Sequence, residues 1–176
     1  MVKYWISHRG NINDKLPMEE NKPQYVLNAL DKGFDVVIDV WVVDNKIFLG
    51  NEEPLYQINI DFLKNPLLWC RAQNFDALIL LNNNRNFIHS FSHDKDDYVL
   101  TSKGMIWAHP GKKINENTIC VIHEKDNINY TEADLMNCLG VCSDYVEIYK
   151  HRIGYVLDDI HLSPGPQDDF CGVAWD

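Results

Sequence analysis

The first 43 residues constrain the fold most, because they carry the patterns of a strand, a helix and a second strand. Residues 3–8 are rich in β-formers and end at His8-Arg9-Gly10. Residues 21–33 place apolar side chains at helical spacing, with Asn21 as the expected N-cap and Gly33 as the stop. Residues 35–43 are apolar almost throughout, as in a strand buried on both faces. This order predicts a parallel crossover unit.

Shorter patterns follow along the rest of the chain. We expect strands over residues 67–72, 86–91, 105–108, 118–122 and 141–145, a helix capped by Asn74 and ending at Leu81, and a helix over 131–138 capped by Thr131. Because a full barrel needs about 200 residues, about seven strands with short crossovers predict a trimmed or incomplete (β/α)8 barrel, mostly parallel. We expect one domain over residues 1–176. The tail 154–176 shows no clear period, and Pro164-Gly165-Pro166 marks a turn in it.

Composition narrows the class of protein. Hydrophobic residues make up 45% of the chain, which is enough for a packed core. The net charge of -10 argues against nucleic acid and anionic membranes as partners. No apolar run reaches the length of a membrane span, and residues 1–10 lack the pattern of a signal peptide. The five cysteines follow no disulfide or zinc pattern, so we expect reduced thiols and a cytoplasmic location.

Three residues, two at the end of the first strand and one inside the second, suggest chemistry. His8 can move a proton near neutral pH, and the neighbouring Arg9 can donate two hydrogen bonds to a phosphate. Asp39 lies between two apolar residues of the second strand, where a carboxylate is costly unless it is paired or holds a metal ion. In a barrel the carboxyl ends of the strands meet on one face, so these side chains are expected to converge.

The order of these motifs resembles the glycerophosphodiester phosphodiesterase family. The matching parts are His8-Arg9-Gly10, Glu20-Asn21 before the helix, and the segment from Asp35 to Val40 that carries Asp39. The specific part of the resemblance covers residues 5 to 54, although Gly140 to Asp144 also resembles the family's last strand. The resemblance implies a barrel that cleaves phosphodiesters around a divalent cation, Ca²⁺ or Mg²⁺. It further implies His8 as a catalytic histidine, Arg9 as the phosphate ligand, and Glu20 with Asp39 as metal ligands.

Several positions depart from the family's pattern. Val37 stands where a metal-binding glutamate is expected, Asn51 where a second histidine is expected, and Arg71 lies near the place of another metal carboxylate. Glu52 could supply a replacement carboxylate, or belong to a solvated turn. His93 could supply a second imidazole over the barrel mouth, or lie in a solvated loop, and His109 follows the next strand in the same way. Asp39 could equally form an ion pair with Arg71 on a neighbouring strand.

Two functions remain open from the sequence. The first is a hydrolase of phosphodiesters such as glycerophosphodiesters, with activity weakened by these departures. The second is a catalytically inactive barrel that binds a phosphorylated small molecule or a protein partner. In either case the expected ligand is a small phosphodiester or phosphate ester, and the substrate alcohol, the metal ion and the oligomeric state are left open.

Overall fold

The computed structural model describes residues 1–126 and 129–162, and its first elements are those expected. Strand β1 (Tyr4–His8) is followed by helix α1 (Pro23–Asp31) and strand β2 (Asp35–Val43), and the two strands pair in parallel. The N-cap prediction is wrong: Lys22 is the N-cap, without a side-chain hydrogen bond. Asn21 instead adopts a left-handed conformation at φ 62, and its side chain binds Asp39.

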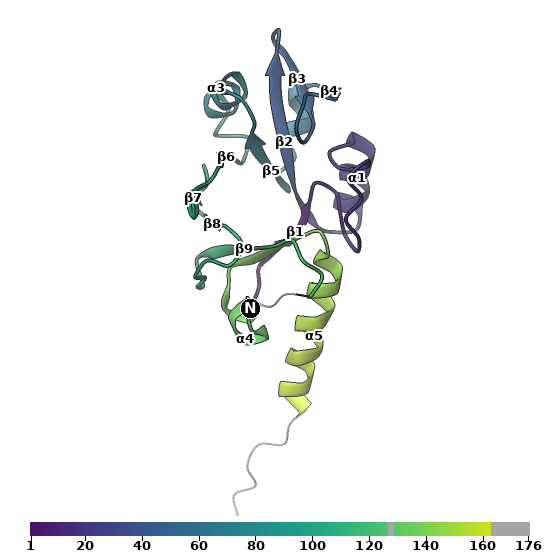
Figure 1. Cartoon of the computed structure of the whole chain (residues 1–176), viewed down its shortest axis with the longest axis vertical. Helices are drawn as coiled ribbons and strands as arrows, with labels where there is room; N and C mark the ends of the chain where they lie inside the picture. The colour runs from purple at the N-terminus through teal and green to yellow at the C-terminus, as the bar shows by residue number, and fades with distance from the viewer. Residues whose placement is uncertain (127–128, 163–176) are drawn as a thin grey trace, which may run out of the picture.

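The remaining elements build one curled sheet with helices on its outside (Figure 1). In chain order they are β3 (Lys46–Leu49), β4 (Tyr56–Ile58), α2 (Ile60–Leu63), β5 (Leu68–Ala72), α3 (Phe75–Asn83), β6 (Ser90–Ser92), β7 (Tyr98–Leu100), β8 (Ile106–Ala108), β9 (Thr118–Ile122), α4 (Glu132–Asn137), β10 (Gly140–Ser143) and α5 (Val146–Leu162). The strand order is β4-β3-β2-β1-β10-β9-β8-β7, and β5 joins β2 to β6. Asn74 and Thr131 are the N-caps of α3 and α4, as predicted.

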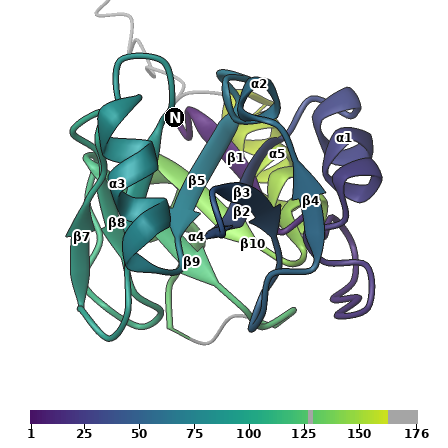
Figure 2. The ribbon, with the colours of Figure 1, turned by 90° about the horizontal axis from the view of Figure 1, so that it is seen from above.

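The prediction of a mostly parallel trimmed (β/α)8 barrel is wrong. The sheet is mixed: β3 pairs antiparallel with β2, β4 with β3, and β7 with β8. Several crossovers also lack a helix, as between β8 and β9. Figure 2 shows the resulting half-barrel from above, with α1 and α5 on one side of the sheet and β7 and β8 at the other end.

The curling of the sheet follows from large apolar residues on its inner face. One buried cluster takes its members from seven strands and none from a helix: Ile6, Val37, Trp69, Phe91, Trp107, Ile119, Val121 and Cys142. The rings of Phe91 on β6 and Trp107 on β8 lie 4.8 Å apart, although these strands do not pair with each other. A flat sheet would keep strands so distant in its order far apart, so packing of this inner cluster requires the curl.

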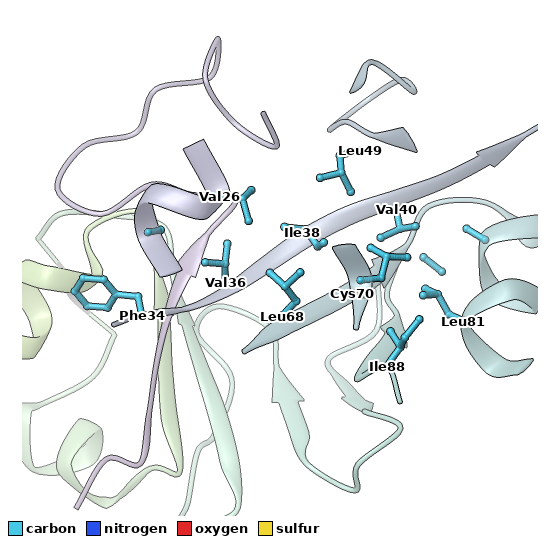
Figure 3. Packing of buried hydrophobic residues seen from close by; sticks show 14 of the residues in the cluster. Val26, Phe34, Val36, Ile38, Val40, Leu49, Leu68, Cys70, Leu81 and Ile88 are labelled. Atoms are coloured by element: carbon cyan, nitrogen blue, oxygen red, sulfur yellow. The ribbon is translucent and has the colours of Figure 1, made fainter. Parts of the chain in front are cut away.

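The other face of the sheet is covered by helices. Alternate residues of β2 and β5 point outward and pack with Val26 of α1 and Leu81 of α3, as Figure 3 shows. A second outer cluster joins α4 and α5 to β9 and β10. Burial of both faces explains why residues 35–43 are apolar almost throughout.

The elements that the sequence analysis missed are β3, β4 and β7, which make the antiparallel pairings, and the helices α2 and α5. Strand β3 returns from β2 through Asp44-Asn45, both in left-handed conformations at φ 49 and 60, which is the geometry of a tight hairpin turn. Helix α5 continues through residues 154–162 of the segment for which no period was visible, and the expected turn at Pro164-Gly165-Pro166 lies outside the described residues. Within the described part of the chain, no helix is long and apolar enough to cross a membrane.

Candidate functional site

The polar residues at one end of the half-barrel follow a simple rule of position. Each lies two residues after a member of the inner cluster, so it continues the inward-facing row of its strand. The pairs are Ile6 and His8, Val37 and Asp39, Trp69 and Arg71, Phe91 and His93, Trp107 and His109, Val121 and His123, and Cys142 and Asp144. These strands run parallel, so their carboxyl ends bring all seven side chains to the same rim.

A pocket of about 260 Å³ opens at this rim, and we call it the histidine pocket. Its lining residues are His8, Arg71, Gln73, His93, Asp94, Trp107, His109, Pro110, Val121 and His123. Four imidazoles and one guanidinium therefore face a single cavity. Such a set offers hydrogen-bond donors and groups that transfer protons near neutral pH, which suits an anionic substrate.

His8 and His123 share the buried carboxylate of Asp144. The His8 Nδ1 atom lies 2.9 Å from Asp144 Oδ1, which also accepts a 2.7 Å hydrogen bond from Asn11. The His123 Nδ1 atom lies 3.7 Å from Asp144 Oδ2, and the two imidazole rings are 5.0 Å apart. Burial lowers the pKa of His8, although Asp144 opposes this effect. Burial acts to raise the pKa of Asp144, but the His123 and His8 imidazoles bring it well below its usual range.

His93 and His109 form the second imidazole pair. The His93 Nε2 and His109 Nδ1 atoms lie 3.2 Å apart, within hydrogen-bond distance. Burial lowers the pKa of His93, and the nearby positive charges of Arg71 and His109 lower it further. The pair comes from the loops after β6 and β8, while His8 and His123 follow β1 and β9. The pocket therefore receives two separate imidazole pairs.

Arg9, Glu20, Asp39 and Arg71 form a connected set beside the pocket, which we call the arginine network. Asp39 Oδ1 accepts from Arg71 Nε at 2.7 Å and lies 2.6 Å from its Nη2. Asp39 Oδ2 lies 2.7 Å from Arg9 Nε, and Glu20 Oε2 accepts a 3.0 Å hydrogen bond from Arg9. Burial acts to lower the pKa of Arg9, but Asp39 and Glu20 outweigh it and raise that pKa. The alternative that Asp39 pairs with Arg71 is thus confirmed.

The loop after β1 places Arg9 in this network. Arg9 and Gly10 both have positive φ, at 58 and 98, which turns the chain sharply away from the strand. A side chain at Gly10 would meet the Tyr25 ring, because an added Cβ would lie 2.5 Å from Tyr25 Cδ1. Glycine is therefore needed here, both for the turn and for the close contact with Tyr25. The Arg9 side chain points to Glu20 and Asp39, and Arg9 is not among the residues that line the histidine pocket.

Glu20 and Asp39 both contact Arg9, and their carboxylate oxygens already accept hydrogen bonds, so in this arrangement they do not fit a hard cation. Arg9 and Asn11 donate to Glu20. Arg71, Gln73 and Asn21 donate to Asp39. A Ca²⁺ or Mg²⁺ ion needs several free oxygen ligands and would meet two fixed guanidinium charges here. The Ca²⁺ or Mg²⁺ site inferred from the family resemblance remains a prediction.

The structure separates the other predicted residues. His93 lines the histidine pocket, whereas Glu52 is exposed in the connection between β3 and β4 and is not among the pocket's lining residues. Asn51, expected at the position of a second histidine, lies in the same connection. The sequence analysis did not consider His123, and it named Asp144 without a role. Both come directly after a strand, two positions beyond an inner-cluster residue, and this spacing is the signal that could have found them.

A larger pocket of about 550 Å³ lies along β7 and β8, away from these groups. The described residues that line it are mostly apolar, and they include no histidine and no carboxylate. The histidine pocket is therefore the better candidate for chemistry. Comparison with known proteins adds no name to it: no family model, no curated protein and no solved structure was found to match the chain.

Proposed function

We propose that the chain hydrolyses a small phosphodiester in the histidine pocket, with imidazoles as the acid and base and Arg71 as the phosphate ligand. The observation that carries the proposal is that two imidazole pairs and one guanidinium line one cavity. Hydrolysis of a phosphodiester needs a base for water, an acid for the leaving oxygen and positive charge for the phosphoryl oxygens. The pocket contains side chains of all three kinds.

Arg71 suits the phosphate better than Arg9 does. Its side chain is 14% exposed and lines the pocket, while Asp39 fixes its Nε and one terminal nitrogen. A guanidinium has five N–H donors in one plane, so those not facing Asp39 remain for a phosphate. Because Asp39 already holds the side chain in place, little rotamer entropy is lost when the ligand binds.

His8 suits the role of base. With its Nδ1–H donating to Asp144, the imidazole keeps Nε2 as a proton acceptor. Its lowered pKa, which follows from burial, favours the neutral form that a base requires. Water then gives a proton to His8 as its oxygen bonds to phosphorus. The bond from phosphorus to the leaving oxygen breaks, and that oxygen takes a proton from the His93–His109 pair, which must carry one proton more than two neutral imidazoles for this step.

A second candidate is binding of a phosphate ester without turnover, as the sequence analysis also left open. The size of the pocket favours a phosphate monoester over a larger phosphodiester, because about 260 Å³ is below the usual range for small-molecule sites. A phosphate with short substituents fits such a volume. We propose the cytoplasm as the location for either function, since Cys70, Cys120, Cys138 and Cys142 are buried free thiols.

Hydrolysis of glycerophosphocholine and of bis(p-nitrophenyl) phosphate in EDTA tests the proposal. We expect His8→Asn to lower kcat/KM by about 10²- to 10⁴-fold, the usual worth of one acid or base group. Arg71→Lys should lower it by about 10- to 100-fold through the loss of charge-assisted hydrogen bonds, and Arg9→Lys by much less. His151→Gln, at an exposed position of α5, is the control.

Three results would count against hydrolysis by these groups. Activity that EDTA abolishes and Ca²⁺ restores would indicate that hydrolysis depends on a cation bound by Glu20 and Asp39. Absent hydrolysis, together with glycerol phosphate binding that depends on Arg71, would favour the binding function. Absence of both would remove the histidine pocket as a phosphate site. Circular dichroism of every variant separates these results from loss of folding.

A further inference from the structure

His8, His123 and Asp144 together have the composition of a transition-metal site. Each residue offers one ligand atom, and the three atoms lie within 4.8 Å of one another. Two imidazoles and one carboxylate are the donors found in many zinc sites, with a fourth position left open. Ca²⁺ and Mg²⁺ prefer oxygen ligands only, so this donor set selects against the hard cations that the sequence suggested.

A second observation points to a missing ligand at the same place. Asp144 is completely buried, and its Oδ2 atom has no hydrogen-bond partner among the described residues. The nearest imidazole atom, His123 Nδ1, lies 3.7 Å away, which is beyond hydrogen-bond distance. Two atoms that bind one tetrahedral zinc ion at 2.0 to 2.1 Å are about 3.4 Å apart. The separation of these two atoms is thus closer to that of two zinc ligands than to that of a hydrogen-bonded pair.

The rest of the local structure supports the site. Asn11 donates a 2.7 Å hydrogen bond to Asp144 Oδ1, so this carboxylate is oriented by a neighbour, as ligating carboxylates usually are. His8 and His123 also line the histidine pocket, which gives an ion a path from solvent and leaves its fourth position toward the cavity. The His123 side chain is 40% exposed, so it has room for a small movement toward Asp144.

We propose that His8, His123 and Asp144 bind one Zn²⁺ ion, and that this ion inhibits the hydrolysis proposed above. The second part rests on the proposed function, because a His8 imidazole that ligates zinc can no longer accept a proton from water. The zinc site itself stands apart from that function, since it is argued only from the three ligands and the unpartnered carboxylate oxygen.

Calorimetric titration of the metal-free protein with Zn²⁺ tests the site without any assay of activity. We expect one ion per chain and a rise in Tm, because a ligand that binds only the folded state stabilises it. His123→Gln should weaken the affinity by about tenfold or more, since even neighbours of metal ligands contribute that much. Asp144→Asn should do the same, and His151→Gln should leave the affinity unchanged. Ca²⁺ should give no comparable heat.

Several outcomes would overturn the site: no saturable zinc binding, equal binding of Ca²⁺, or zinc binding that survives His123→Gln and Asp144→Asn but is lost in His93→Gln. The last result would place the ion on the His93–His109 pair. Inhibition is measured separately, as hydrolysis with and without one equivalent of Zn²⁺. Zinc binding without any hydrolysis in EDTA would leave the site standing and count against the proposed function, whereas hydrolysis that bound zinc leaves unchanged would count against inhibition alone.

Discussion

The arginine network and the histidine pocket lie side by side at the rim of the half-barrel, yet their polar groups are satisfied to different degrees. The oxygens of Asp39 and Glu20 all face donors or cations from Arg9, Arg71, Gln73 and the asparagines at positions 11 and 21. In the pocket region two buried atoms, Asp144 Oδ2 and His93 Nδ1, have no hydrogen-bond partner among the described residues. Arg9 Nε also lacks a well-angled hydrogen bond, but it lies 2.7 Å from Asp39 Oδ2.

This difference indicates which polar groups stabilise the fold and which are available to a ligand. A buried polar atom without a partner is costly, so it is rarely kept unless a ligand or a reaction uses it. A fully partnered carboxylate needs no ligand and instead holds neighbouring strands in register. In this chain Asp39 connects β2 to β5 through Arg71, and it connects β2 to the loop after β1 through Arg9. We therefore expect Arg9, Glu20 and Asp39 to contribute mainly to stability and the histidine pocket mainly to function, with Arg71 belonging to both regions.

The largest expected effect on stability is at Asp39. Asp39→Asn removes the charge shared by two guanidiniums whose side chains are each 14% exposed. Breaking a buried ion pair by neutralising one partner costs about 3 to 5 kcal/mol of unfolding free energy. The matched variant Asp144→Asn should cost less, about 1 to 3 kcal/mol, because it weakens hydrogen bonds without leaving two guanidiniums unpaired. Urea denaturation of both variants measures the two losses.

The comparison between the two regions fails if the order of these losses is reversed. An Asp144→Asn protein less stable than the Asp39→Asn protein would mean that the histidine pocket carries the structural role. Equal losses of unfolding free energy in the two variants would mean that the number of hydrogen-bond partners of a carboxylate does not tell a structural region from a functional one. In a glycerol phosphate binding assay of the same two proteins, Asp39→Asn acts through the position of Arg71 and Asp144→Asn through that of His8.

A smaller effect on the unfolding free energy is expected at His89, a buried histidine outside both regions. Its Nε2 atom lies 2.9 Å from Thr101 Oγ1, and its ring lies 4.1 Å from that of Trp69. Burial, with a smaller effect from Lys103, lowers the pKa of His89 to about 4 from an ordinary value of 6.5. The unfolded chain therefore takes up this proton at a higher pH than the folded protein does. The contribution is complete above pH 6.5 and is lost as the pH falls from 6.5 toward 4.

From pH 7 to pH 5 this loss should amount to about 1 to 2 kcal/mol after allowance for solvent. Gln at position 89 keeps a hydrogen-bonding side chain but cannot take up a proton, so His89→Gln should show a smaller fall in stability over this range. Denaturation curves at both pH values, with His151→Gln as a control, measure the difference. If His89→Gln falls as steeply as wild type, the pH dependence arises from the pocket histidines instead.

Much of the local structure was predictable because it depends on short-range chemistry. The parallel pair β1 and β2 follows from two apolar runs with a helix between them, and the caps at Asn74 and Thr131 follow from side chains that satisfy helix amides. The antiparallel strands were missed because they are only three or four residues long and partly exposed. The Asp44-Asn45 turn was the available signal for the first of them.

The candidate site was predictable only in part, for a different reason. The sequence analysis grouped His8, Arg9, Glu20 and Asp39 because they lie in one stretch of sequence. Arg9 contacts both Glu20 and Asp39, whereas His8 contacts Asp144. His123 and Asp144 are distant from that stretch, and only the curl of the sheet brings them to His8. The curl depends on packing of inner residues from seven strands, which no local pattern reveals. Once the strands were placed, the two-residue spacing from an inward-facing residue would have identified both His123 and Asp144.

The smallest expected effect provides a reference outside both regions. Helix α4 packs against α5 on the outer face, and its N-terminus carries a capping box. Thr131 Oγ1 accepts a 3.1 Å hydrogen bond from the Asp134 amide, and Asp134 Oδ2 accepts one of 2.8 Å from the Thr131 amide. Thr131→Ala removes the first bond and the 2.7 Å hydrogen bond that the Thr131 hydroxyl donates to Asp134 Oδ2, and should cost about 1 kcal/mol, whereas Thr131→Ser keeps the hydroxyl and should cost less. Chemical denaturation measures both changes.

Glycerol phosphate binding should stay at the wild-type level in the alanine variant, because α4 contributes no lining residue to the histidine pocket. Weaker phosphate binding in Thr131→Ala would show that a modest loss of stability anywhere in the chain disturbs the pocket. The effects of Asp39→Asn and Asp144→Asn on binding could then no longer be assigned to the positions of Arg71 and His8.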